Sequence, residues 1–195
     1  MGERRQRLRE FRLVEPKKQG YSAREVDAFF VQLVEDFENL RAGRTHPGMM
    51  TSTTIRTMSF TPVQGGYYPA DVDATLDRVE DRFASLERRR YIEKYGRQTW
   101  RQAVEESAEL VMGRINRAPG ERFRRPSSTR VQGYFVDDVD ALCEKLRQHF
   151  QGEGELSASL VRRAVFRSAV GSLCYEETQV DAFMDRCIEL MLDLK

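Results

Sequence analysis

The sequence predicts an all-α fold built from four copies of one short repeat, each a turn followed by a helix. A Gly-Tyr frame stands at a fixed distance before a Val-Asp-Ala run, and the residues after each frame follow a helical period. Such internal similarity has to be interpreted before any single element. The frames are Gly20-Tyr21 with Val26-Asp27-Ala28, Gly66-Tyr67 with Val72-Asp73-Ala74, Gly133-Tyr134 with Val139-Asp140-Ala141, and Cys174-Tyr175 with Val180-Asp181-Ala182.

Apolar residues after each Val recur in steps of four, three and four, which is the spacing of a heptad seam. A strand would need alternation with period two, and these runs lack it. A helix with one apolar stripe has to pack that stripe on another helix. The predicted helix-pairing seam is Val26, Phe30, Leu33 and Phe37, then Val72, Leu76, Val79 and Phe83, then Val139, Cys143, Leu146 and Phe150, then Val180, Met184, Cys187 and Met191.

The copies fall into two pairs. Residues 1–86 hold the first pair, with frames at 20–28 and 66–74, and residues 121–195 hold the second, with frames at 133–141 and 174–182. Ser22 and Glu25 predict a capping box for the first helix, while Thr51 and Ser157 each predict the N-cap of a short lead-in helix. Residues 87–120 form a connecting helical segment with a stripe from Trp100 to Ile115.

We expect the helices to pair within one chain, copy one on copy two and copy three on copy four, as two coiled-coil-like pseudo-dimers. A short tether gives an effective concentration on the order of millimolar, so pairing within the chain favours a monomer, although self-association stays open. A parallel arrangement requires the connection to travel back about 30 Å, the length of a 20-residue helix. Residues 41–66 are long enough for this, and an antiparallel arrangement also stays open.

The composition excludes several classes of protein. Lys and Arg total 32 against 31 Asp and Glu, so the balance does not favour a nucleic-acid partner. A charged fraction of 32% with 40% hydrophobic residues suits amphipathic helices. No apolar run approaches the roughly 18 residues of a membrane span, and the N-terminus lacks the apolar core of a secretory signal. A cytoplasmic location is therefore expected.

The residues that carry chemistry are few and scattered. Cys143, Cys174 and Cys187 have no paired spacing, which argues against disulfides or a zinc site, and two of them fall on the seam as small apolar residues. His46 and His149 have no nucleophile or acid at a motif spacing. The sequence therefore predicts no catalytic residue, no metal site, no cofactor and no enzyme.

The frame residues favour structural roles. An Asp in the first turn of each helix suits the positive end of the helix dipole better than a metal site. Each frame Tyr is interpreted as a buried anchor, with a recognition role as the alternative. Gly20, Gly66 and Gly133 are expected either to take a positive φ or to let the Tyr pack closely against the backbone. The Arg clusters at 88–90, 122–125 and 162–163 are typical of solvated faces.

These residues resemble the N-terminal module of DivIVA-domain proteins. That module has a Leu-Thr lead-in, an apolar residue, a Phe, a Gly-Tyr turn and a Val-containing helix. Copy two is similar to it from Met50-Thr51 through Ile55, Phe60 and Gly66-Tyr67 to Val72. Copy four matches with two extra residues between Phe166 and Tyr175, while copies one and three match from the Phe onward.

The resemblance implies a non-enzymatic, self-associating cytoplasmic protein of the cell-division and polar-growth class, whose function is protein-protein interaction or scaffolding. In that family the module pairs as a parallel helical dimer and inserts an apolar side chain at the tip of the turn into the membrane. Here the tips carry no Phe, and Val131 and Leu173 are the candidate membrane tips. The alternative function is a peripheral adaptor that binds anionic membranes through the basic clusters and these tips. The protein partner is not identified by the sequence.

Overall fold

The computed structural model describes residues 11–195. They form two units, and the boundary between the units along the chain falls between Lys94 and Tyr95. Both units use the same plan, in which two long helices are preceded by short strands that pair with each other. Residues 87–94 continue a helix of the first unit, while residues 95–120 belong to the second.

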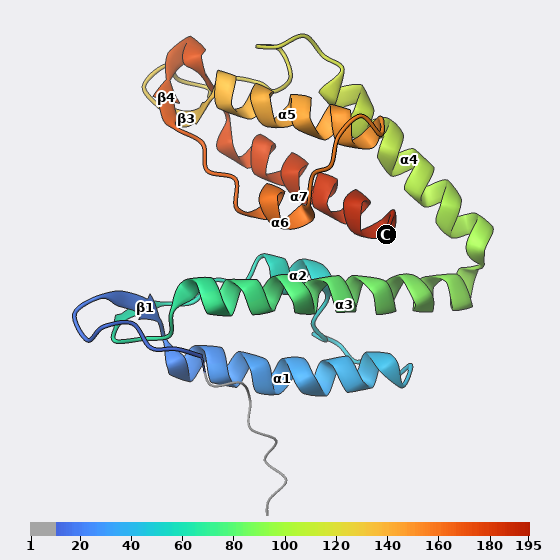
Figure 1. Ribbon diagram of the computed structural model, residues 1–195. Coiled ribbons are helices and arrows are strands. Elements are labelled where there is room, and N and C mark those ends of the chain that lie inside the picture. Colours follow the sequence, from blue (N-terminus) through green and yellow to red (C-terminus); the bar gives the residue numbers. More distant parts are fainter. Residues whose placement is uncertain (1–10) are drawn as a thin grey trace, which may run out of the picture. The chain divides into compact units, whose positions relative to one another are not determined.

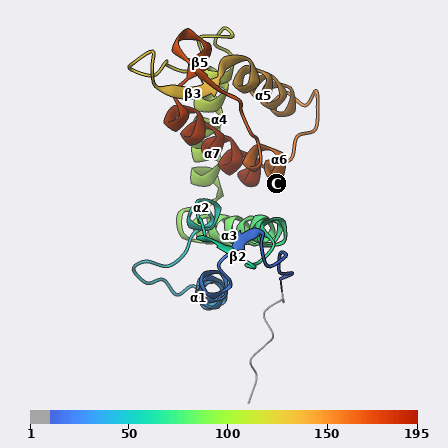
Figure 2. The ribbon, with the colours of Figure 1, turned by 90° about the vertical axis from the view of Figure 1, so that its left-hand side faces the viewer.

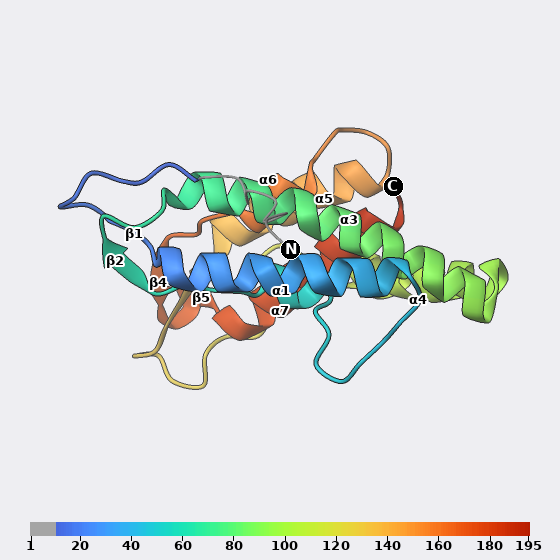
Figure 3. The same cartoon turned by 90° about the horizontal axis from the view of Figure 1, so that it is seen from below.

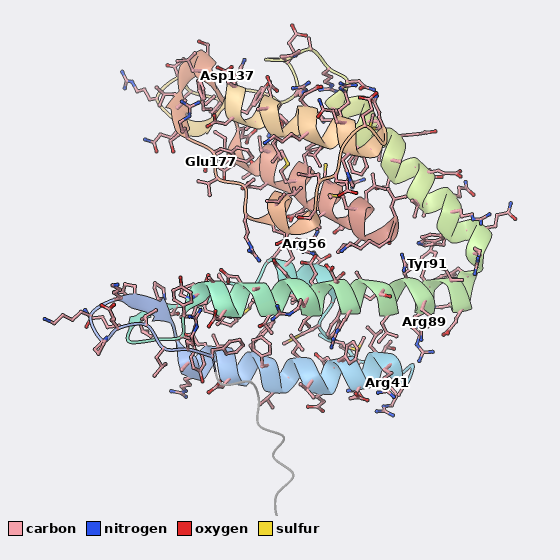
Figure 4. All side chains as sticks on the ribbon, viewed as in Figure 1. Arg41, Arg56, Arg89, Tyr91, Asp137 and Glu177 are labelled. Carbon is pink, nitrogen blue, oxygen red and sulfur yellow. The ribbon has the colours of Figure 1, made fainter. Side chains whose placement is uncertain are left out.

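The first unit places two long helices side by side. Its elements are β1 (Gln19–Tyr21), α1 (Ala23–Arg41), α2 (Ser52–Arg56), β2 (Pro62–Gln64) and α3 (Pro69–Tyr95). Figures 1 and 3 show α1 and α3 running in the same direction, and Figure 2 looks along α1 nearly end-on. Arg41 near the end of α1 and Arg89 late in α3 lie at the same end of this pair (Figure 4). The two helices of the first unit are therefore parallel.

Local signals explain where these helices begin. Ser22 Oγ accepts the Glu25 N–H at 3.4 Å, and Thr51 Oγ1 accepts the Thr54 N–H at 3.1 Å. The predicted capping box forms only in part, because the Glu25 carboxylate accepts the N–H of Thr61 at 2.8 Å. Glu25 thus fastens its helix to the strand region of the neighbouring copy.

The core of the first unit lies between α1 and α3. Val26, Phe30 and Leu33 of α1 are buried, as are Val72, Leu76 and Phe83 of α3. Phe37 and Val79 are half-buried against this cluster, and the Phe37 and Phe83 rings lie 5.3 Å apart. Further apolar side chains widen the core beyond the seam; they are Phe29, Leu40, Ile55, Phe60 and Leu86.

The second unit repeats this arrangement and adds a helix. Its elements are α4 (Arg97–Ile115), β3 (Gln132–Phe135), α5 (Val136–Phe150), α6 (Ala158–Arg162), β4 (Ser168–Val170), a 3₁₀ turn η1 (Gly171–Leu173), β5 (Cys174–Tyr175) and α7 (Glu177–Asp193). Asp137 and Glu177 begin α5 and α7 at the same end of the unit, so these helices are also parallel (Figure 4). α4 packs on α5 and α7 with Val111 and Ile115 fully buried.

The seam residues of the second unit are mostly buried. Val139, Cys143 and Leu146 of α5 are buried, Phe150 is half-buried, and the seam positions of α7 are buried; these are Val180, Met184, Cys187 and Met191. All three cysteines are free thiols. Burial raises the pKa of Cys143 to about 12 and also raises that of Cys187, so both stay neutral and pack as small apolar groups.

The prediction of an all-α fold is wrong, because three of the four frames lie in short β-strands and Tyr67 of the remaining frame forms β-bridges to Leu13 and Tyr21. β1 pairs with β2 in one antiparallel sheet, and β3 lies between β4 and β5 in another. Gly20 stands opposite Val63, and Gly133 stands opposite Ala169 in the equivalent register. Strands of two to four residues are too short to display an alternating pattern, and each pairs with a segment far away in the sequence.

The frame glycines serve a close crossing of two backbones. Gly20, Gly66 and Gly133 do not have positive φ, which overturns the first of the two roles expected for them. A Cβ built on Gly20 would lie 2.5 Å from the Tyr67 carbonyl oxygen, and one on Gly66 would lie closer still to that of Tyr21. Gly133 approaches the carbonyl of Tyr175 in the same way. Only a residue without a side chain fits such a crossing.

The fourth turn has a different shape. Between β4 and β5 the chain forms η1, whereas β2 is followed by only Gly65 and Gly66 before Tyr67. Cys174, which stands where the second copy has Gly66, is buried, and its Sγ lies 3.6 Å from the Gly171 carbonyl oxygen. At the second crossing Gly133 is the frame residue without a side chain.

Substituting this glycine tests the crossing. Gly133→Ala should destabilise the protein by about 1–3 kcal/mol or more, because the new Cβ overlaps backbone that cannot rotate away. Gly113→Ala is the matched control, since a Cβ there meets no atom within 4 Å inside helix α4. The control should gain about 0.5–1 kcal/mol from the better helix former. Denaturant unfolding measures both, and a Gly133→Ala protein as stable as the wild type would contradict the crossing.

Candidate pairing site at the frame crossings

Each crossing joins the Tyr of one frame to the Asp of the frame paired with it. In the first unit, Tyr21 and Tyr67 exchange backbone hydrogen bonds of 2.9 and 2.8 Å. The Tyr67 hydroxyl donates to Asp27 Oδ1 at 3.1 Å. Burial raises the pKa of Tyr21, and the charge of Asp73 and a hydrogen bond to it add to the rise. The Tyr of each copy is thus hydrogen-bonded to the Asp of the paired copy.

The second unit has the same reciprocal hydrogen bonds between Tyr and Asp. The Tyr175 hydroxyl lies 3.1 and 3.2 Å from the two Asp140 carboxylate oxygens. Burial raises the pKa of Tyr134 to about 12, and the charge of Asp181 and its hydrogen bond contribute. Burial likewise raises the pKa of Tyr175 to about 12. All four frames therefore use Tyr and Asp in one reciprocal pattern.

In the second unit the hydrogen bond between Tyr175 and Asp140 is part of a larger buried ionic network. The Arg122 guanidinium is almost fully buried, and its Nη1 lies 3.0 Å from Asp140 Oδ1. Arg122 Nε donates to the Ile115 carbonyl at 3.0 Å, and the Gly120 N–H donates to Asp140 Oδ2 at 2.7 Å. Asp140 thereby fastens the loop after α4 to α5. The buried charge is paired and satisfied, as stability demands.

These pairs do not follow from the sequence pattern. The helix-dipole role predicted for the frame aspartates is incomplete, because Asp27 and Asp140 also accept hydrogen bonds from the tyrosines of the paired copies. The signal was present, because Tyr and Asp stand six residues apart in every frame. Arg122 belonged to a cluster interpreted as a solvated face, and it is buried. Its neighbour Arg124 is exposed and ion-paired with Glu176.

The two histidines lie where the long helices lead into their connections. His46 Nε2 is 2.8 Å from Asp36 Oδ1, an acid ten residues earlier that no motif spacing revealed. His149 Nδ1 accepts the Leu156 N–H at 3.2 Å. No nucleophile takes part in either contact, so the arrangement is that of a tether.

The candidate membrane tips lie at one end of the second sheet. Val131 is 49% exposed and Leu173 60% exposed. Val170 is also 49% exposed and stands opposite Gln132, the residue after Val131. In the first unit the same end of the sheet carries Gln19 opposite Gln64. The tip of the second unit is thus more apolar than that of the first.

Within residues 11–195, no group of three or more His, Cys, Asp or Glu side chains is placed to hold a metal ion. None of the helices in this part of the chain is both long and apolar enough to cross a bilayer. No family model, curated protein or solved structure matches the chain.

Removing the Tyr175 hydroxyl tests the hydrogen bonds between Tyr and Asp of paired copies. Tyr175→Phe deprives Asp140 of a donor and leaves the Arg122 N–H, 3.3 Å from that hydroxyl, without its acceptor. A loss of about 1–3 kcal/mol is expected, because the groups are buried. Tyr68→Phe is the control, since that ring is 43% exposed and should change stability little.

The raised tyrosine pKa predicts how pH acts on this loss. A raised pKa contributes stability that is complete below about pH 10, the ordinary tyrosine value, and is lost as the pH approaches 12. Wild type should therefore lose more stability than Tyr175→Phe between neutral pH and pH 11. Equal losses in denaturant unfolding would argue against the bond.

Proposed function

We propose that this chain is a non-enzymatic interaction or scaffold protein of the DivIVA type, a class of cell-division and polar-growth factors. The observation that supports the proposal is the parallel pairing of two module copies within each unit. The resembling family forms such a pair between two chains. A chain that carries two complete pairs is a monomeric equivalent of two dimers, linked in tandem.

The polar groups at the crossings support a structural role for the frames. Tyr175, Asp140 and Arg122 are bonded to one another and buried, so they hold the fold together. The surfaces that can bind a partner therefore lie outside the crossings. Two linked units can engage two partner molecules, or two sites on one partner, and linkage raises affinity through effective concentration.

Capture from an extract of the native host tests this proposal. The bait is the tagged full-length chain, with Gly113→Ala as a folded control. Gly66→Ala disturbs the crossing of the first unit, and Gly133→Ala that of the second. We expect wild type and Gly113→Ala to retain the same proteins, and each crossing variant to lose some of them. Retention of no specific protein by the folded baits would contradict a scaffold.

The second candidate is a peripheral adaptor for anionic membranes. It is favoured by the exposed apolar tip formed by Val131, Val170 and Leu173, with the exposed Arg130 adjacent in sequence. An apolar tip beside a basic residue suits insertion between anionic headgroups.

Co-sedimentation with vesicles tests the adaptor. Binding to vesicles with anionic lipid, weakened by salt and by Val131→Ser with Leu173→Ser, would support it. Val165→Ser is the matched control, because Val165 is 91% exposed and lies outside the tip. No binding, or equal binding by the tip variant, would leave the scaffold as the sole candidate.

A further inference from the structure

Asp36 of α1 fastens the connection between α1 and α2 at two points. Its side chain is fully buried. Asp36 Oδ2 accepts the Met50 N–H at 3.0 Å, while Oδ1 accepts from His46 Nε2 at 2.8 Å and from Gln32 Nε2 at 3.1 Å. The connection returns alongside α1 toward α2 (Figure 3). One carboxylate therefore holds both ends of the turn that contains His46.

The turn itself is pre-formed by its sequence. Pro47 and Gly48 occupy its central positions, Gly48 has φ of 79°, and the Met49 N–H donates to the His46 carbonyl at 3.2 Å. Pro followed by a Gly with positive φ is the signature of a type II turn. Such a turn keeps the His46 ring near Asp36 at little further entropic cost.

Both ring nitrogens of His46 face acceptors. Nε2 meets the Asp36 carboxylate, and Nδ1 lies 3.1 Å from the Pro47 carbonyl oxygen. Neither oxygen can donate, so both ring nitrogens must, and only the charged imidazolium has two N–H groups. The ring is 41% exposed and can exchange protons with water.

The surrounding charges agree with this geometry. The hydrogen bond to Pro47 raises the pKa of His46, the bond to Asp36 adds to it, and the charges of Asp36 and Glu35 act in the same direction. Burial alone would raise the pKa of Asp36, but the bonds from Met50, His46 and Gln32 lower it. Nearby on the connection, Arg44 Nε is bonded to Asn39 Oδ1 at 3.0 Å.

The second unit has the same tether with the opposite chemistry. His149 stands ten residues after Val139, as Asp36 does after Val26, and Leu156 precedes its lead-in helix as Met50 does. His149 Nδ1 accepts the Leu156 N–H at 3.2 Å, which requires a lone pair on that nitrogen. Its ring centroid lies 5.5 Å from that of Phe150, and Arg147 on the same helix is paired with Glu144.

We propose that a charged His46 closes the connection after α1, because only the imidazolium can donate to Asp36 and to the Pro47 carbonyl at once. Acidification toward pH 5 strengthens this closure. Alkalinisation weakens it, because the stability from a raised histidine pKa is lost as the pH passes above it. Asp36 stays ionised in this range, since its pKa is lowered from an ordinary value that is already below pH 5.

Hydrogen exchange on the full-length chain tests this directly. The readout is the protection factor of the Met50 amide, corrected for the intrinsic rate, from about pH 5 to pH 8. Met50 protection should fall with rising pH, by up to about tenfold for each pH unit of upward shift measured for His46. The chain has only two histidines, so the ring resonances of His46 can be assigned and its charge followed in the same samples.

His46→Gln is the matched variant. Its amide can still donate to Asp36 without titrating, so Met50 protection should become independent of pH. The proposal is overturned if Met50 protection does not fall with rising pH in wild type. It is also overturned if the trend survives in His46→Gln.

Discussion

The fold depends on two backbones crossing so closely that a side chain cannot stand between them. At the first crossing both residues are glycines, and the Tyr21 and Tyr67 backbones then exchange hydrogen bonds on the far side. The long helices start immediately after these strands, so the crossing sets their common direction and brings their seams together. The reciprocal bonds between Tyr and Asp then fix each helix start to the other copy.

The two units keep this geometry while changing the side chains that make it. Cys174 stands where the first unit has a crossing glycine, and the 3₁₀ turn η1 precedes it. Glu25 accepts the Thr61 N–H in the first unit, and Asp138 accepts that of Arg167 at 2.9 Å in the second. The tether after the first long helix uses a carboxylate in one unit and an imidazole in the other. The two units therefore share the same hydrogen bonds to backbone N–H groups, while the side chains that make them differ.

The helices could be predicted from the sequence because their signal is local and long. Seam positions such as Val26, Val72, Val139 and Val180 recur with a period that only a helix has, and all four are fully buried. The strands could not be predicted in this way, since two to four residues carry no period and their partners lie far along the chain. The same distance hid the acceptors of the tyrosines and the burial of Arg122. Asp36 stands only ten residues before His46, but that spacing matches no motif.

Both copies of each pair belong to one chain, which makes each unit a closed pair. Light scattering on the purified full-length protein, over a range of concentrations, tests whether this closure holds in solution. We expect the mass of a single chain, because the tethered partner outcompetes a free one. An obligate dimer at every concentration, with helices exchanged between chains, would contradict it.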